Sequence, residues 1–462
     1  MTPSRKSYLA VLLIAALGAS GCSTISKINP FHGKGGPKEV ATEGERISIV
    51  TADQKLEPAE ALKGVDFALP LPQRMADWPL PGGTAEQSTG NIDAAPGLAI
   101  AWRRGFGKGS KEGELVTAPP VAAGGKVFVM DAAAEVSAHD AQTGAEVWRV
   151  NMRPGDNKRD REGFGGGLAY ADGKVYMTSG FRLVAQIDAA TGKVGWRART
   201  EQPVHGAPTV SGGRVMAVAL DNTLMTFDTA TGAPGWTYQA LSESARILSS
   251  SSPAISGDTV VASFGSGELV ALRTANGNDL WNEALSRASR TSALSEIRDI
   301  AGRPVIYQGD VFAVSHSGVF AATDLRTGQA RWSLPVVGIT SPLPVGDVVY
   351  VMAVDGQLIC TARETGQIYW MRNLNAGYVA KRKGGVWFIG GKKVLKPIWS
   401  SPILVNNRLI LVSSTGQLAA LSAKTGEIEK RIDLGAPALI GPIAAGNSIY
   451  VALDNAQLIA LR

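Results

Sequence analysis

Cysteine is almost absent from this sequence, whose 462 residues contain only Cys22 and Cys360. If Cys22 is acylated, no intrachain disulfide can form. The four histidines occupy unrelated positions without the spacing of metal ligands. The chain also lacks a nucleophile elbow, a Walker loop and a zinc signature. We therefore expect no catalytic residues, no metal and no cofactor.

The chain also lacks clustered charge of one sign and interleaved aromatic residues. Its formal net charge is +6, but the basic residues are scattered, and only 6% of the residues are aromatic. A nucleic-acid surface needs clustered basic residues with aromatic platforms between them, so we expect no nucleic-acid partner. The glycine-rich stretches 105–113 and 163–167 lack the strand-to-helix context of a phosphate-binding loop, and we interpret both as turns.

The N-terminus contains an apolar run, residues 8–19, that is too short to span a membrane as a stable helix. Arg5 and Lys6 precede this run, and the small residues Ser20 and Gly21 follow it. This order is typical of an export signal.

The stretch "LGASGC", which ends at Cys22, resembles the lipoprotein box of bacteria. The resemblance implies that residues 1–21 are a signal peptide and that Cys22 is lipidated and becomes the new N-terminus. Ordinary cleavage near Gly21, leaving a free thiol, is the alternative. Ser23 in place of Asp implies, by the same resemblance, a lipid anchor in the outer membrane, with the protein facing the periplasm.

A short motif recurs along the rest of the chain. The stretch "DAQTGAEVWRV", residues 140–150, contains a turn dipeptide, Thr143-Gly144, and a tryptophan four residues after the glycine. Equivalent dipeptides end at Gly192, Gly232, Gly277, Gly328, Gly366 and Gly426, at intervals of 38 to 60 residues. Tryptophan follows in every copy but the last, which has Lys430; the tryptophans are Trp148, Trp196, Trp236, Trp281, Trp332 and Trp370.

These intervals match the blade of a β-propeller, which holds four strands in about 40 to 50 residues. Short runs of alternating or β-branched residues flank each turn, as expected for strands. A blade cannot bury both faces alone, so we expect each tryptophan to cover the junction with the next blade.

The C-terminal copy is incomplete, because "AQLIALR" stops before its turn and outer strand. The stretch "LAIAWRRGFG" supplies such a strand near the other end, with Trp102 in register with the series. We therefore predict an all-β protein, an eight-bladed β-propeller whose ring is closed by an N-terminal strand that completes the C-terminal blade. Seven blades and a loose strand are the alternative.

The chain therefore divides into three predicted parts. Residues 1–21 are predicted to be a signal peptide, residues 22–95 a mostly irregular tether rich in Gly, Pro and polar residues, and residues 96–462 the propeller. Within the propeller, the basic stretch 376–397 is interpreted as a hairpin inserted in the seventh blade. Cys360 takes a position where other repeats have alanine, which predicts a small buried side chain.

The pattern Ala-x-Asp-x-x-Thr-Gly-x-x-x-Trp resembles the tryptophan-docking repeat of pyrroloquinoline-quinone (PQQ) propellers. One class with this repeat comprises the quinone-dependent dehydrogenases, which bind the quinone and Ca²⁺ in the funnel. Their adjacent cysteine pair is missing here, as are the long inserts between blades. A dehydrogenase or another ligand-binding propeller is therefore the alternative interpretation.

The other class is the BamB family of outer-membrane protein assembly lipoproteins, which the chain resembles over nearly its whole length. The resemblance implies a non-catalytic scaffold that binds the periplasmic domains of the β-barrel subunit BamA, is monomeric within a larger complex and assists insertion of outer-membrane proteins. Two loops of this chain correspond to the family's contact loops. The implied partner-binding residues are Arg246, Leu248, Leu294, Ile297 and Asp299.

Overall fold

The computed structural model describes residues 56–155, 163–242, 251–286, 299–378 and 396–462, and the backbone of two short strands at 382–383 and 392–393. These residues belong to one compact unit, Ala52–Arg462. In these ranges the only helix is the 3-10 helix η3 (Glu60–Leu62), and the rest is strand or irregular backbone. None of the described helical segments is long and apolar enough to cross a membrane.

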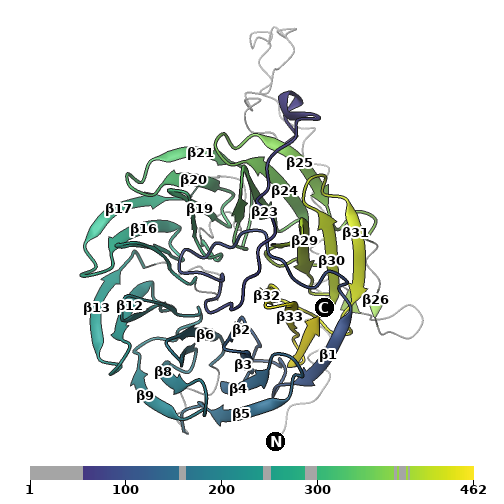
Figure 1. Cartoon of the computed structure of the whole chain (residues 1–462). Coiled ribbons are helices and arrows are strands. Elements are labelled where there is room, and N and C mark those ends of the chain that lie inside the picture. Colours follow the sequence, from purple (N-terminus) through teal and green to yellow (C-terminus); the bar gives the residue numbers. More distant parts are fainter. Residues whose placement is uncertain are drawn as a thin grey trace, which may run out of the picture. The chain divides into compact units, whose positions relative to one another are not determined.

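Eight four-stranded antiparallel sheets are arranged as the blades of a propeller (Figure 1). This confirms the predicted fold class. The strands of blade 1 are β2 (Val121–Ala123), β3 (Lys126–Met130), β4 (Glu135–Asp140) and β5 (Glu146–Asn151); of blade 2, β6 (Gly166–Ala171), β7 (Lys174–Ser179), β8 (Leu183–Asp188) and β9 (Val194–Arg199); of blade 3, β10 (Thr209–Ser211), β11 (Arg214–Val218), β12 (Thr223–Asp228) and β13 (Pro234–Gln239); of blade 4, β14 (Ala254–Ser256), β15 (Thr259–Ser263), β16 (Glu268–Arg273) and β17 (Asp279–Ala284).

The remaining blades follow the same order. The strands of blade 5 are β18 (Val305–Tyr307), β19 (Asp310–Val314), β20 (Phe320–Asp324) and β21 (Ala330–Leu334); of blade 6, β22 (Leu343–Val345), β23 (Val348–Met352), β24 (Gln357–Ala362) and β25 (Ile368–Asn373); of blade 7, β28 (Ile403–Val405), β29 (Arg408–Val412), β30 (Gln417–Ser422) and β31 (Ile428–Asp433); of blade 8, β32 (Ile443–Ala445), β33 (Ser448–Ala452) and β34 (Gln457–Leu461), with β1 (Ile100–Gly105).

The ring is closed by the pairing of its two most distant strands. β1 pairs antiparallel with β34, and Trp102 lies opposite Ala460. The backbone of Ala99 and that of Arg462 extend this ladder with two hydrogen bonds of 2.7 and 2.8 Å. The predicted closure by an N-terminal strand is therefore confirmed. Because β1 pairs with β34, blade 8 has its full set of four strands.

The three inner strands of each blade are nearly continuously buried, whereas most residues of the outer strands are exposed or half-buried. β29 and β30, for example, contribute Leu409, Leu411 and Leu421 to the core between blades, while β31 is mainly exposed. Cys360 lies on β24 and is fully buried, as predicted, and burial raises the pKa of its thiol. The inner strands therefore stabilise the ring by apolar burial on both faces.

At seven blade junctions a tryptophan on an outer strand contacts the turn glycine of the next blade. A Cβ atom added to Gly328, for instance, would lie 2.6 Å from Cγ of Trp281, and the φ of Gly328 is +72°. The other contacts join Trp102 to Gly144, Trp148 to Gly192, Trp196 to Gly232, Trp236 to Gly277, Trp332 to Gly366 and Trp370 to Gly426. Glycine meets both demands, because it tolerates positive φ and has no side chain to keep the indole away.

The eighth junction explains why Lys430 breaks the series. Its neighbour, blade 8, is assembled from the two ends of the chain, so no turn joins β34 to β1. An indole at position 430 would thus have no turn glycine to cover. Lys430 instead donates a hydrogen bond to the carbonyl oxygen of Gly97, just before β1, at 3.0 Å.

Residues 68–92 cross one end of the ring and contact every blade, and this segment passes over its centre (Figure 1). We call residues 68–92 the plug. Its hydrogen bonds to blades 1 to 8 in turn include Trp78–Ala122, Pro79–Tyr170, Gln87–Thr209, Ala85–Ile255, Glu86–Ile306, Ala68–Asp347, Ile92–Leu404 and Met75–Gly446. Trp78 and Ile92 are only 2% exposed. This part of the region predicted to be a tether thus packs on the propeller.

The basic insertion contains a two-stranded antiparallel sheet, β26 (Arg382–Lys383) with β27 (Lys392–Lys393). It lies in the chain between β25 of blade 6 and β28 of blade 7. A hairpin is therefore present where the sequence predicts one.

Candidate functional site

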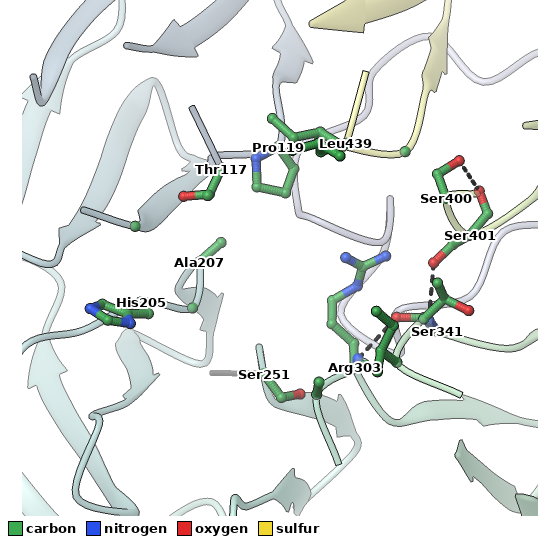
Figure 2. A pocket seen from close by; sticks show the side chains of 18 of the residues that line it. Thr117, Pro119, His205, Ala207, Ser251, Arg303, Ser341, Ser400, Ser401 and Leu439 are labelled. Carbon is green, nitrogen blue, oxygen red and sulfur yellow. Dashed lines mark hydrogen bonds between the residues drawn. The ribbon is translucent and has the colours of Figure 1, made fainter. Parts of the chain in front are cut away.

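A cavity of about 470 Å³ opens at the centre of the ring (Figure 2). Its walls come mainly from the residues that precede the inner strands, such as Gly206 before β10, Thr340 before β22 and Ser400 before β28. Apart from a hydrogen bond from Gln87 to the carbonyl oxygen of Pro253, the hydrogen bonds of the plug to the inner part of each blade involve residues within or after those inner strands. Since the inner strands of all blades start at the same face, the cavity and the plug occupy opposite ends of the channel.

Arg303 projects a guanidinium group into this cavity (Figure 2). Its backbone N–H donates to Oγ of Ser341 at 2.9 Å, which ties blade 5 to blade 6. Its Nε is buried and has no hydrogen-bond partner among the described residues. Burial lowers the pKa of Arg303 to about 10, so the group is still protonated at neutral pH.

Serine hydroxyls continue around the wall from Arg303 (Figure 2). Oγ of Ser401 accepts a hydrogen bond from the backbone N–H of Ser341 at 3.0 Å, and Oγ of Ser400 donates to the carbonyl oxygen of Ser401 at 3.0 Å. Oγ1 of Thr117, in blade 1, is buried without a partner in the described part of the chain. The wall therefore contains several hydroxyl groups, and those of Ser400 and Ser401 already form hydrogen bonds within the wall.

The remaining wall is aromatic and aliphatic. His205 lies against Phe164, with ring centroids 4.5 Å apart. Leu115, Ile398 and Leu439 line the cavity and are still 38%, 48% and 51% exposed. Among the described residues that line the cavity, none is Asp or Glu. The cavity thus has one cationic group, a polar stretch of hydroxyls and an apolar stretch.

The cavity and the predicted partner-binding loops are adjacent in the sequence. Arg246, Leu248, Leu294 and Ile297 lie outside the described residues. Asp299 is described and is 1% exposed, and its carbonyl oxygen accepts a hydrogen bond from the backbone N–H of His316 at 2.9 Å. The first loop leads directly to Ser251 and Ser252, and the second to Ala301–Arg303, all of which line the cavity.

The recurring aspartates of the repeat act within their own turns. Oδ1 of Asp228 accepts hydrogen bonds from the backbone N–H groups of Ala230 and Thr231 at 3.0 and 2.8 Å, and from Oγ1 of Thr231 at 2.8 Å. These bonds, the hydroxyl first, lower the pKa of Asp228. Asp140, Asp188 and Asp324 form the same turn. Such bonds stabilise a hairpin, so these aspartates have a structural role in their own turns.

Sequence reasoning missed Arg303 as a functional residue, although one signal was present. The residue before the proline of the inner strand is small in five other blades, namely Ala207, Ser252, Ser341, Ser401 and Gly441. An arginine in that series is an exception that the alignment of the repeats could have exposed. Among the described residues, no group of three or more His, Cys, Asp or Glu side chains could hold a metal ion.

Comparison with known proteins gives a consistent result. The family model described as "Outer membrane protein assembly factor BamB" matches residues 88–153, 132–372 and 385–462. The chain is 22% identical to the outer membrane protein assembly factor BamB of Moranella endobia, over 73% of this chain and 82% of that protein. It is 23% identical to the protein of that name from Escherichia coli, over 68% of this chain and 76% of that protein.

Solved structures share the fold. BamB from Moraxella catarrhalis superimposes with a TM-score of 0.64 at 17% identity, over 79% of this chain and 99% of that chain. Quinohemoprotein alcohol dehydrogenase from Comamonas testosteroni superimposes with a TM-score of 0.63 at 15% identity, over 82% of this chain and 77% of that chain. At these identities the structures show the fold alone. The family model covers most of the propeller, and the chain belongs to the BamB family of outer membrane protein assembly factors.

Proposed function

We propose that this protein is a non-catalytic scaffold of the outer-membrane β-barrel assembly machinery, which binds the periplasmic domains of a BamA-like subunit. The observation that carries the proposal is the match of the family model to residues 88–153, 132–372 and 385–462, which span the propeller. The closed ring supports it, because its cohesion comes from repeated internal contacts and leaves its loops available to partners.

The proposed contact surface is the face on which the cavity opens. The loops before β14 and β18 contain Arg246, Leu248, Leu294 and Ile297, and both lead into the cavity wall. Asp299 is buried, so we propose that it stabilises the second loop from within the protein. The residues before it would contact the partner.

Attachment to the membrane completes the proposal. Residues 1–21 would be removed as a signal peptide, Cys22 would carry the lipids, and residues 22–95 would join the anchor to the propeller of residues 96–462. The plug fixes the end of that linker to the ring. Two or more acyl chains anchor a protein stably, and tethering raises the effective concentration of a partner at the same membrane.

A quinone-dependent dehydrogenase is the alternative, because such enzymes share the fold. In the part of the cavity wall that is described, however, the donors are a guanidinium group, an imidazole, hydroxyls and backbone groups, without a carboxylate. Ca²⁺ takes six to eight oxygen ligands, typically including Asp or Glu. The described residues therefore do not fit a calcium-dependent quinone site.

The test is affinity purification of the full-length protein from gently solubilised native membranes, with mass spectrometry of the proteins that co-elute. We expect the β-barrel assembly subunit in near-stoichiometric amount. Recovery of the propeller alone would contradict the scaffold role, and a quinone reconstitution assay would then test the alternative.

Loop variants then test the proposed face. We expect the double substitution Arg246→Ala and Leu248→Ala to reduce recovery of the subunit without changing the thermal unfolding midpoint. Arg326→Ala is the matched control, because Arg326 is an exposed arginine on the outer turn of blade 5. Equal recovery with all three proteins would show that the assigned face is wrong.

A further inference from the structure

Arg303 is the exception in a ring of small residues. It precedes the proline that leads into the inner strand of blade 5, and the matching residues of five other blades are Ala207, Ser252, Ser341, Ser401 and Gly441. All six residues line the cavity. The small residues keep the centre of the ring open, and Arg303 extends a long cationic side chain into it (Figure 2).

The backbone that carries Arg303 is held tightly. A Cβ atom added to Gly302 would lie 2.5 Å from the carbonyl oxygen of Thr340 in the next blade. Oγ of Ser263 in blade 4 contacts the carbonyl oxygen of Gly302 at 3.3 Å. Contacts with blades 4 and 6 therefore hold the backbone that leads into blade 5. Binding of a ligand would cost little conformational entropy in this backbone.

Among the described residues, the guanidinium group has no counter-charge. None of its nitrogens forms a hydrogen bond or ion pair with a residue in the described ranges, and no carboxylate lines the cavity there. A partly buried cation without an anionic partner is destabilising, and its lowered pKa reflects this cost. An anion that entered the cavity would supply the missing partner.

The rest of the cavity indicates what kind of anion fits. Leu115, Ile398 and Leu439 are exposed aliphatic side chains that line the same space. The guanidinium group points towards Pro119 and Leu439 (Figure 2). An acidic head group at Arg303 would thus place an attached apolar group against these side chains, and its burial would add to the affinity.

We propose that the cavity is a binding site for a small organic acid, with its carboxylate on the guanidinium of Arg303 and its apolar body on Leu115, Ile398 and Leu439. The planar guanidinium matches a carboxylate through paired N–H donors. The plug crosses the opposite end of the channel (Figure 1). The inference does not rest on the proposed scaffold role, although the cavity opens on the face proposed to contact the partner.

Isothermal titration calorimetry of the mature full-length protein tests the site, with 3-phenylpropionate as the probe and 3-phenylpropionamide as its uncharged match. We expect the acid to bind and the affinity of the amide to be lower by at least about tenfold, as for loss of a charge-assisted hydrogen bond. Arg303→Gln should weaken binding of the acid by a similar factor. Arg326→Gln, which removes an exposed arginine outside the cavity, should leave it unchanged.

Equal binding of acid and amide, undiminished binding by Arg303→Gln, or no binding of the acid at millimolar concentration would each overturn the proposal. Inorganic phosphate bound as tightly as the probe would also contradict it, because the apolar wall would then contribute nothing. Should Arg303→Gln fail to fold, Arg303→Lys keeps the charge without the planar donor pair and should bind the acid more weakly than the unsubstituted protein.

Discussion

Nε1 of Trp281 donates a hydrogen bond to the carbonyl oxygen of Leu325 in the next blade, at 2.7 Å. The same indole covers Gly328, the turn glycine of that blade. Four other junctions repeat the hydrogen bond, from Trp148, Trp196, Trp236 and Trp332. Each of these five tryptophans therefore joins two blades by an apolar contact and a polar one.

Two junctions use a tyrosine for the polar contact. Tyr350 donates to the carbonyl oxygen of Ala423 at 2.9 Å, and Tyr450 to that of Ala141 at 3.0 Å. Nε1 of Trp370 and of Trp102 then has no partner among the described residues. At these two junctions a tyrosine hydroxyl, in place of an indole N–H, donates to the carbonyl oxygen that follows the third strand. Trp370 still covers Gly426, and Trp102 still covers Gly144.

Truncating Trp281 should destabilise the ring strongly. The residue is 9% exposed, and Trp281→Ala should lower the free energy of unfolding by about 3 to 5 kcal/mol, through lost burial and an unfilled cavity. Chemical denaturation followed by tryptophan fluorescence and circular dichroism measures this. Lys430→Ala, at the matching position of blade 7, is the control and should change the value by about 0.5 kcal/mol or less.

Gly328→Ala should cost more than Gly309→Ala. Both glycines have positive φ, +72° and +84°, so both variants pay for the left-handed backbone, about 1 to 2 kcal/mol. Only at Gly328 would the new Cβ meet an indole, which adds about 1 to 3 kcal/mol of overpacking. Equal unfolding midpoints for the two variants would show that the tryptophan does not constrain the turn.

Lys430→Trp should not stabilise the protein, although it restores the consensus of the repeat. Blade 8 has no turn glycine for the indole to cover, and the substitution removes the hydrogen bond from Lys430 to Gly97. We expect an unchanged or lower thermal unfolding midpoint. A clear increase would mean that the indole packs on β1 in some other way.

Acid should weaken the turns that contain Asp140, Asp188, Asp228 and Asp324. Hydrogen bonds donated by threonine lower the pKa of Asp140, Asp228 and Asp324 in the folded protein. The pKa of Asp188 is lowered most by a hydrogen bond from Lys174, and next by those from Thr191. A lowered folded-state pKa contributes stability that is present above the unfolded-state pKa, about 3.9, and is lost as the pH falls through and below it. Unfolding midpoints between neutral pH and about pH 2 should fall, and fall less steeply in Asp228→Asn. A parallel fall in both proteins would assign acid sensitivity to other groups.

The repeat made the fold predictable from the sequence. Turn glycines, tryptophans and alternating strands are local signals with a fixed spacing, so each copy of the motif reinforces the interpretation of the others. The closing strand around Trp102 could be found because it keeps the same register. The partner-binding residues were inferred from family resemblance, and only Asp299 of these lies in the described chain, where it is buried.

The plug and the cavity could not be predicted in this way. Residues 68–92 carry no repeat, and their contacts with all eight blades exist only once the ring has closed. Asn91 and Asn407, for example, share a side-chain hydrogen bond of 2.7 Å across 316 positions of sequence. Nothing local indicates such a pairing.

The sequence alone thus determined the blades, their number and the order in which they join, because each depends on short-range turn and strand chemistry. The tertiary structure decided which residues meet at the centre. Closure of the ring brings the starts of the inner strands together. The single arginine in a row of small residues then projects into a partly apolar cavity, without an ionic partner among the described residues. That environment depends on side chains from several blades, and no one segment of the chain contains it.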